Sequence, residues 1–461
     1  MADEIALQIH SGILRHGERL PSLREMRLRR GLSLSTVQEA FRLLEDQGLV
    51  DARPQSGFFV RRPAPSPVPA ALGTPTAIAV DPLLWSYVQE IPVDNPRVFE
   101  GFRSATPAPS LLPVAQLQKL MVDTLRHHPE LLSDYGSPLG CVELRLQIAR
   151  RSLEWGGQLE PAHLLITHGA IEALNLALRA VTRPGDVVAV ESPTYFSLLR
   201  SMENMGLRVL EIPTHPQHGM SYEALELATR NGAVQAVSLI ANYANPLGSL
   251  MPDATKARIA ALMAERDIPL IEDDVYGELH FGPKRPAPLK AFDRSGHVLY
   301  CSTLTKTLAP GLRIGWIEAG RYLPQVELQK YLGTHSTPQL SQRVLARVLE
   351  SGGYARHMRG FRRALYAQMM QMLAGVERYF PAGSRFCAPQ GGFSLWVELP
   401  PHCDSVALFQ LSRAEGIGFA PGPLFSPRGE YRHCLRLAGS GHWDDAQEAR
   451  LKRLGELACR Q

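Results

Sequence analysis

The chain has 461 residues, more than one ordinary core would bury, so we expect at least two domains. Its 45% hydrophobic and 20% charged residues are typical of globular proteins, and its apolar runs are too short to cross a bilayer. A net charge of +4 is too small to indicate nucleic-acid binding by itself. The N-terminus lacks the pattern of an export signal, and the six cysteines have no metal-ligand spacing. These features predict a cytoplasmic protein without disulfides, bound metal or a membrane role.

The first sixty residues predict three short helices. Ile5, Ile9 and Ile13 form an apolar stripe at helical spacing. A second helix is predicted from Ser22, whose hydroxyl can cap it while Glu25 closes a capping box. The third follows the turn at Gly31, and its core positions are expected to be Val37, Ala40, Phe41 and Leu44.

The sequence LVDARPQSGFFVRR, at 49–62, predicts two strands around a QSG turn. Two helices joined by a tight turn and followed by a hairpin are the outline of a winged helix-turn-helix. Residues 1–62 contain ten arginines, no lysine and eight acidic residues, a net charge of +2 that is compatible with phosphate contact. We therefore place a winged helix-turn-helix domain of α+β class at 1–62.

A change of composition follows at 61–80, RRPAPSPVPAALGTPTAIAV, where proline and small residues replace any periodic pattern. Proline favours an extended backbone, so this segment is expected to be a semi-rigid spacer. We place a linker at 63–82 and a second domain at 83–461.

The second domain alternates strand and helix patterns over more than 200 residues. Such alternation predicts an α/β fold with a mainly parallel sheet covered on both faces and with sites at the carboxyl ends of the strands. Long helical patterns beyond Tyr322 and two later strands predict a smaller α+β lobe. The strands of the main sheet are expected at 164–170, 186–193, 235–241, 268–276, 297–303 and 313–320.

Polar residues at the ends of these strands match the needs of pyridoxal 5′-phosphate (PLP) chemistry. PLP needs a lysine for its aldehyde, an acid beside its pyridine nitrogen, and anion binders for its phosphate. Lys306 follows one strand and is the expected Schiff-base residue, and Asp273 ends another. Arg313 can bind phosphate through two hydrogen bonds. Each residue alone has a plainer explanation, as a surface charge or a helix cap, and their combination carries the hypothesis.

Further residues complete the expected cofactor site. Gly169 and Ala170 open a helix whose N–H groups can bind an anion, and Thr303 and Thr305 offer hydroxyls to the same phosphate. The remaining candidates are placed to contact the cofactor ring or its phenolic oxygen, and they are Tyr195, Asn245 and Tyr276.

From about residue 85 onward the chain resembles the fold type I aminotransferases. The motifs that carry the resemblance occur in the family's order, and they are YGSPLG (135–140), THGAIEAL (167–174), ESPTYF (191–196), NPLG (245–248), EDDVYGEL (272–279) and TKTLAPGLRIGW (305–316). The resemblance implies a large PLP lobe at about 115–320, a small lobe at about 330–461, and a homodimer. It also implies that Tyr135 reaches the partner's phosphate and that Arg436 binds an amino-acid carboxylate. Leu247 departs from the usual NPTG and leaves Asn245 in place.

Residues 1–62 resemble the winged helix-turn-helix of GntR-type bacterial regulators. In that family an arginine of helix 2, the start of helix 3 and the wing contact double-stranded DNA. Leucine and glutamine stand at 34 and 38, where arginines are frequent, so a different base preference is expected. Capping of helix 3 remains an alternative role for its serines and threonine. The implied DNA contacts are Arg24, Ser33, Leu34, Ser35, Thr36, Gln38 and Gly57.

A GntR-type domain joined by a proline-rich spacer to an aminotransferase-like domain resembles the MocR-type regulators. The resemblance implies a transcription factor that senses PLP, an amino compound, or both, through Lys306. The alternative is an active aminotransferase, acting between amino acids and 2-oxo acids, whose DNA-binding module is autoregulatory. The target genes, the effector, the sign of regulation and any retained turnover are not specified by the residues.

Overall fold

The computed structural model describes residues 1–10, 13–15, 17–46, 49–53, 56–61, 76–79 and 100–461. The chain forms two compact units, 1–66 and 67–461. Most of the expected linker, 63–82, lies outside the described residues, so its boundaries stay a prediction. Ile78, at its far end, pairs with Val209 of the larger unit through two backbone hydrogen bonds of 2.9 and 2.8 Å.

The smaller unit has the predicted order of three helices and a hairpin. The Ser22 hydroxyl accepts a hydrogen bond from the Glu25 N–H at 3.2 Å and so caps the second helix, while the Glu25 carboxylate pairs with Arg29. The two strands pair antiparallel, with Val50 opposite Val60. The elements are α1 (Ala2–His10), α2 (Leu23–Arg30), α3 (Leu34–Asp46), β1 (Val50–Arg53) and β2 (Gly57–Val60).

The core of the smaller unit confirms the helical pattern of α3. Val37, Ala40, Phe41 and Leu44 are all buried, together with Ile5 and Ile9 of α1. The expected third member of the α1 stripe was wrong: the helix ends at His10, and Ile13 is 69% exposed. Helical spacing continues in the sequence beyond the point where this short helix stops.

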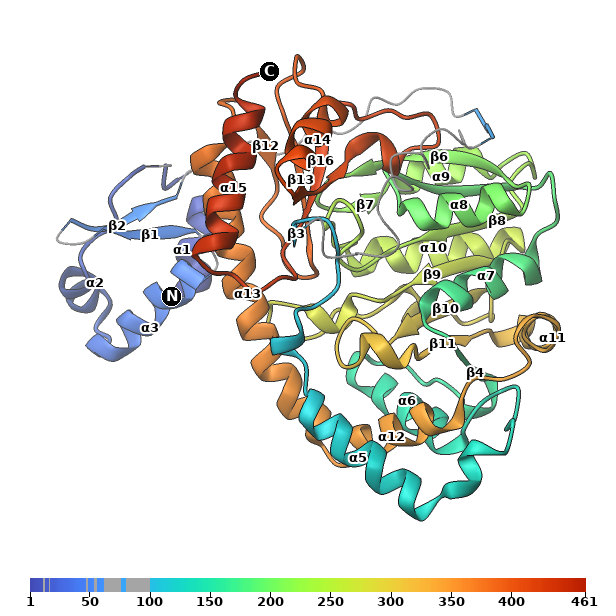
Figure 1. Ribbon diagram of the computed structural model, residues 1–461. Helices are drawn as coiled ribbons and strands as arrows, with labels where there is room; N and C mark the ends of the chain where they lie inside the picture. The colour runs from blue at the N-terminus through green and yellow to red at the C-terminus, as the bar shows by residue number, and fades with distance from the viewer. Residues whose placement is uncertain (11–12, 16, 47–48, 54–55, 62–75, 80–99) are drawn as a thin grey trace. The chain divides into compact units, whose positions relative to one another are not determined.

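An eight-stranded mixed sheet forms the centre of the larger unit (Figure 1). Four neighbouring pairs are parallel, and β11 runs antiparallel to both β10 and β4. The mainly parallel sheet is thereby confirmed, and the long strand β6 is an addition to the expected set. In spatial order the strands are β4 (Leu164–Thr167), β11 (Gly315–Glu318), β10 (Val298–Thr303), β9 (Leu270–Asp273), β8 (Ala236–Leu239), β5 (Val187–Ser192), β6 (Arg208–His215) and β7 (Gly219–Met220).

Helices cover both faces of this sheet, because its strands are apolar on both sides. One buried cluster joins the sheet to α7 (Ala170–Val181), α8 (Phe196–Asn204) and α11 (Leu323–Gly333). A second cluster joins the other face to α9 (Tyr222–Ala228) and α10 (Asp253–Arg266). This three-layer arrangement leaves the carboxyl ends of the parallel strands at one edge, where the predicted site residues gather.

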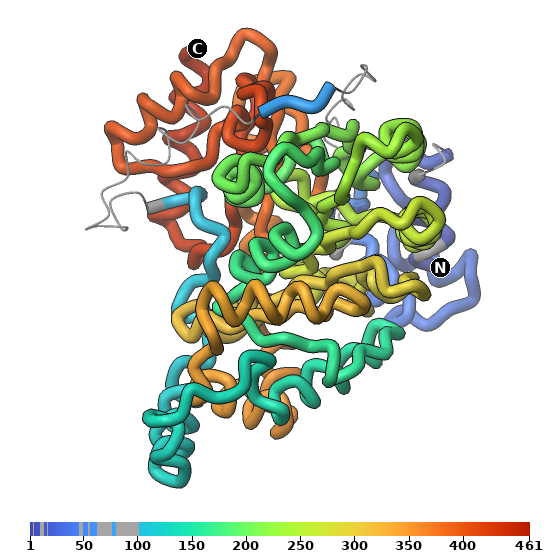
Figure 2. Tube along the Cα trace, turned by 90° about the vertical axis from the view of Figure 1, so that its right-hand side faces the viewer, coloured from blue at the N-terminus to red at the C-terminus, as the bar shows by residue number. Residues whose placement is uncertain are grey.

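The rest of the larger unit consists of a helical layer and a smaller sheet. In Figure 2, α5 (Val114–His127) lies along α12 (Gln339–Glu350), and α6 (Val142–Ser152) packs on α12 as well. The 27-residue helix α13 (Gly353–Tyr379) runs from α12 to the small lobe, where it packs on α15 (Asp445–Ala458). The small lobe contains β12 (Arg385–Phe386), β13 (Ser394–Glu398), β16 (Cys434–Ala438) and β15 (Ala420–Pro421) in one antiparallel sheet, α14 (Ser405–Ala414), and the pair β14 (Ile417–Gly418) and β3 (Glu100–Gly101).

Two kinds of feature are absent from the described residues. None of their helices combines the length and the apolar character needed to cross a membrane. They also contain no group of three or more histidine, cysteine, aspartate or glutamate residues that could hold a metal ion. The site is therefore described from its lysine, arginine, aspartate, tyrosine and amide side chains alone.

Candidate functional site

Lys306 and Asp273 come together because β9 and β10 are parallel neighbours. Asp273 is the last residue of β9 and is paired in register with Cys301, and Lys306 lies in the turn that follows β10. The two side chains interact electrostatically: the carboxylate raises the pKa of the amine, and the amine lowers that of the carboxyl group. The expected pairing of an amine with an acid at the strand ends is thus present in the fold.

The Lys306 amine is largely removed from water and surrounded mainly by cations. Burial, with Arg436 and Arg313 nearby, lowers its pKa to about 8 against the opposing effect of Asp273. Its Nζ donates a hydrogen bond of 2.8 Å to the backbone oxygen of Ala105. A lysine with such a pKa has a substantial unprotonated fraction near neutral pH, which is the form that attacks a carbonyl.

Asp273 is buried and only partly satisfied. It is 4% exposed, and burial, with a smaller effect of Asp274, raises its pKa to about 7. Its Oδ1 has no hydrogen-bond partner among the described residues. A buried carboxyl oxygen without a partner is costly, and a cationic N–H donor would satisfy it.

The N-terminus of α7 and Arg313 meet in a narrow space. Gly169 has a φ of 78°, and the Arg313 Nη2 lies 3.5 Å from the backbone oxygen of His168. A Cβ at Gly169 would come within 2.9 Å of that Nη2, and a Cβ at Gly315 within 2.6 Å of the Gly169 backbone. With Ala170 as the first residue of α7, the backbone N–H groups and the exposed guanidinium can bind one anion.

Thr303 and Thr305 lie beside one another at the end of β10. Their hydroxyl oxygens are 2.7 Å apart, and that of Thr303 is 2.6 Å from the backbone oxygen of Ile314. Both side chains are buried. Thr303 therefore shapes the turn that carries Lys306, and the expected contact with phosphate stays a prediction for both residues.

Asn245, Tyr276 and Arg436 form a connected group beside Lys306. The Asn245 amide donates to the Tyr276 hydroxyl and accepts from the Arg436 guanidinium, each at 3.4 Å. Burial raises the pKa of Tyr276 and lowers that of Arg436. Arg436 is 3% exposed, and its Nε has no partner among the described residues. A buried guanidinium in this state suits a carboxylate ligand.

Tyr195 lies inside the site and Tyr135 lies outside it. Burial raises the pKa of Tyr195, and Asp273, Arg436 and Arg313 are near enough to affect it as well. Tyr135 is 78% exposed, its ring packs edge-on against His335, and its backbone oxygen accepts from Ser336. The expected role of Tyr135 at a partner's phosphate is not tested by one chain.

Sequence reasoning missed the segment 102–108, which crosses the site. The backbone oxygen of Arg103 accepts a hydrogen bond from Arg436, and that of Ala105 accepts from Lys306. Arg103 is half-buried, and burial lowers its pKa. Backbone acceptors leave no sequence signal, although an arginine just before the run TPAPSLLP could have been noticed.

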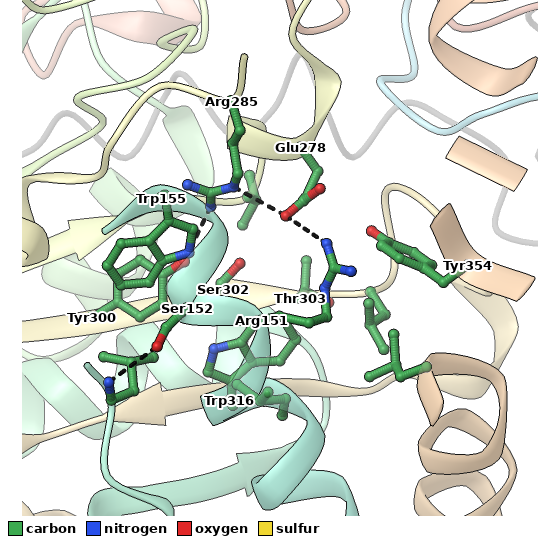
Figure 3. A pocket seen from close by; sticks show the side chains of 15 residues that line it. Arg151, Ser152, Trp155, Glu278, Arg285, Tyr300, Ser302, Thr303, Trp316 and Tyr354 are labelled. Carbon is green, nitrogen blue, oxygen red and sulfur yellow. Dashed lines mark hydrogen bonds and ion pairs between the residues drawn. The ribbon is translucent and has the colours of Figure 1, made fainter. Parts of the chain in front are cut away.

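A buried ion-pair network lies beside the end of β9 and was also missed (Figure 3). Arg285 pairs with Asp274 at 2.5 Å and with Glu278 at 3.0 Å, and Arg151 and Arg362 also pair with Glu278, at 3.1 and 3.0 Å. Burial opposes the ionisation of Glu278, but the three guanidinium groups lower its pKa to about 2. The network holds Asp274, the neighbour of Asp273, in a fixed position.

The predicted DNA-contact residues of α2 and α3 are exposed. The Ser33 hydroxyl accepts from the Thr36 N–H at 3.1 Å and lies 2.8 Å from the hydroxyls of Ser35 and Thr36, so it caps α3. Arg24, Leu34 and Gln38 are also exposed. The capping explanation therefore holds for Ser33, and the exposed hydroxyls of Ser35 and Thr36 and the Gln38 amide stay available to a ligand.

Gly57 opens β2, next to the hairpin turn, part of which lies outside the described residues. Its φ is 96°, a region that disfavours other residues, and a Cβ there would come within 3.4 Å of the Arg19 Nε. Gly57 thus has a backbone reason to be glycine, and its expected contact with DNA stays a prediction.

The comparisons with known families divide the chain in two. The family described as bacterial regulatory proteins, gntR family, matches residues 1–60, and aminotransferase class I and II matches 111–446. The chain is 38% identical over 467 residues to the HTH-type transcriptional regulator YjiR of Escherichia coli, spanning 100% of this chain and 98% of YjiR. It is 37% identical to the regulator YdcR of the same organism, over 99% and 98%.

Aminotransferases match only the later part. Aromatic-amino-acid aminotransferase 1 of Thermococcus litoralis is 29% identical over 76% of this chain and 85% of the enzyme. Among solved structures, α-aminoadipate aminotransferase LysN of Thermus thermophilus, in complex with N-(5′-phosphopyridoxyl)-L-leucine, is similar with a TM-score of 0.74 at 28% identity. That match covers 78% of this chain and 92% of LysN. The full-length similarity is therefore to regulators.

Proposed function

Since the chain belongs to the MocR-type regulators of the GntR family, with a DNA-binding domain fused to an aminotransferase-like domain, we propose that its larger unit binds PLP and an amino compound. Binding of these small molecules then alters the affinity of the smaller unit for promoter DNA. The observation that carries this proposal is the meeting of Lys306 and Asp273 at the ends of β10 and β9.

The residues fit PLP on three separate grounds. Asp273 has a buried oxygen without a partner, which suits the protonated pyridine nitrogen. Gly169 leaves room beside Arg313 that a Cβ would fill, which suits a phosphate at the start of α7. Lys306 has a pKa lowered to about 8, which suits attachment of the aldehyde. When bound, PLP would supply a carbonyl group that takes up an amine and a ring that withdraws electrons.

The side chains of the chain then have distinct tasks. Lys306 holds the cofactor and can carry a proton at its Nζ once an amino compound has taken its place. Tyr276 and Asn245 orient the phenolic oxygen, and Tyr195 covers one face of the ring. Arg436 binds the carboxylate of the amino compound, because its buried guanidinium has an unused Nε. Thr303, Thr305 and Ala170 support the phosphate.

The smaller unit supplies sequence recognition. Gln38 can form two hydrogen bonds to adenine, and Leu34 can contact a thymine methyl group in the major groove. Arg24, Ser35 and Thr36 are exposed and can contact phosphate, together with the region of Gly57. We propose that the regulator acts as a homodimer in the cytoplasm, because two winged helices would read two half-sites and exposed Tyr135 would reach the other protomer.

A mobility-shift measurement tests this function directly. The full-length protein is titrated onto the DNA upstream of its own gene and onto a scrambled duplex, at several salt concentrations, with and without PLP and an amino acid. We expect selective binding whose affinity changes when both small molecules are added. Equal affinity for both duplexes, or no response to either small molecule, contradicts the proposal, and rapid transamination with 2-oxoglutarate would favour an enzyme instead.

A further inference from the structure

Resting on the proposed function, we propose that Arg103 forms a second anion subsite and that the amino compound carries a second acidic group, as in a dicarboxylic amino acid. The compound would bind Arg436 through its α-carboxylate and Arg103 through its distal acidic group. The inference depends on the position of segment 102–108, on the missing partner of Arg103 and on the charges of the whole site.

Segment 102–108 is anchored to the small lobe at both ends. The Phe102 N–H donates to Gly418 and its carbonyl accepts from Ala438, at 2.8 and 2.7 Å. Farther along, the Ser440 side chain donates to the Ser104 carbonyl at 2.6 Å. Arg103 lies between these anchors, with its own carbonyl in contact with the Arg436 guanidinium. Its backbone is therefore held at the border of the site.

The Arg103 guanidinium has no acidic partner among the described residues. Burial lowers its pKa, and no carboxylate offsets this effect. Arg103 is also close enough to Arg436 to lower the pKa of that residue. The buried arginines of the network beside β9 differ, because Arg285 and Arg151 both pair with Glu278. A half-buried arginine beside a second unpaired arginine is unfavourable until an anion binds both.

The charges of the site lead to the same ligand class. Its cations are Lys306, Arg313, Arg436 and Arg103, whereas Asp273 is the acidic group in direct reach of Lys306. A cofactor phosphate would neutralise Arg313, and an α-carboxylate would neutralise Arg436. One guanidinium then remains, and a distal carboxylate is the group that an arginine binds best, through two parallel hydrogen bonds.

The test uses the full-length protein loaded with PLP and isothermal calorimetry. L-Glutamate is compared with L-glutamine, which has the same shape and no distal charge. We expect the parent protein to bind L-glutamate about tenfold or more tightly than L-glutamine. Arg103→Gln is expected to remove this preference by weakening L-glutamate alone, and Arg103→Lys to restore part of it. Equal affinities in the parent, or an unchanged preference in Arg103→Gln, would overturn the proposal.

A second arm separates this inference from the proposed function. Glutarate and butyrate carry no amine and are titrated onto the protein without cofactor; a glutarate preference that Arg103→Gln abolishes supports the subsite even if PLP does not bind. Arg230→Gln is the matched control, because Arg230 is exposed and precedes β8, at the opposite edge of the sheet. If L-glutamate and L-glutamine bind alike and both change DNA affinity, the proposed function stands and the subsite is refuted.

Discussion

At the carboxyl ends of β9 and β10 the polar residues are buried and held by several partners, whereas on α3 they are exposed and held mostly by each other. Asp273 and Arg436 are 4% and 3% exposed, while Ser33, Ser35 and Thr36 share one exposed hydroxyl cluster. Burial makes an unpaired polar atom costly, so it carries information about a missing ligand. An exposed polar atom can bind water and carries none. The following variants are chosen to test this difference.

The largest effect is expected from Lys306→Ala. Loss of the amine removes the group at this position that can bond covalently to PLP, so the visible absorption band of the lysine-bound cofactor should disappear completely. The fold should be retained, because the amine's hydrogen bond goes to one backbone oxygen, that of Ala105. Absorption spectra and circular dichroism of the PLP-treated variant check both statements. A band equal to that of the parent would place the attachment elsewhere.

The next effect is expected from Glu278→Gln, which breaks the network beside β9. Three guanidinium groups would lose their shared carboxylate, and we expect the free energy of unfolding of the larger unit to fall by about 3 kcal/mol. Because the folded pKa of Glu278 is about 2, below the ordinary 4.5, this stabilisation is complete above pH 4.5 and is lost as the pH falls toward 2.

Glu39→Gln is the matched control on α3. Glu39 pairs with Arg42 at 2.9 Å, but both side chains are more than half exposed. Calorimetric unfolding should show a change within about 0.5 kcal/mol for this variant. Equal losses for the two substitutions would contradict the distinction between the buried and the exposed region.

A smaller and opposite effect is expected from Asp273→Asn in protein without cofactor. The folded pKa is raised to about 7 from 3.8, so an ionised Asp273 costs stability above pH 4, and the cost grows until pH 7. The variant should match the parent at pH 4 and exceed it on the order of 2 kcal/mol at pH 8. Thermal unfolding at the two pH values measures this difference, and cofactor retention should fall in parallel. A variant that is less stable at pH 8 would refute the assigned cost.

The smallest effect is expected from Gln38→Ala on the exposed face of α3. Loss of a paired contact to one base should weaken binding of the preferred duplex by about 1–2 kcal/mol and relax selectivity at one position. Unfolding should be unchanged within about 0.5 kcal/mol, because the side chain is exposed. Fluorescence anisotropy with a series of single-base substitutions measures the effect. Uniform weakening on every duplex would show that Gln38 contacts the backbone of the DNA instead.

The sequence by itself determined the division into a winged helix and an aminotransferase-like domain, because periodicity and ordered motifs are local. It also placed Lys306 and Asp273 at the ends of strands, since a strand end can be recognised from its own residues. It could not show that Ile13 lies beyond the end of α1, because tertiary packing decides where a short helix stops.

Only the tertiary structure revealed what approaches the site from distant parts of the chain. Arg103 meets Arg436 across more than 300 residues, and Glu278 meets Arg151 and Arg362 from three separate elements. Such contacts depend on the register of strands and the packing of helices, and no local pattern encodes them. The burial that shifts the pKa values of Asp273 and Lys306 has the same origin, because it is a property of everything that surrounds them.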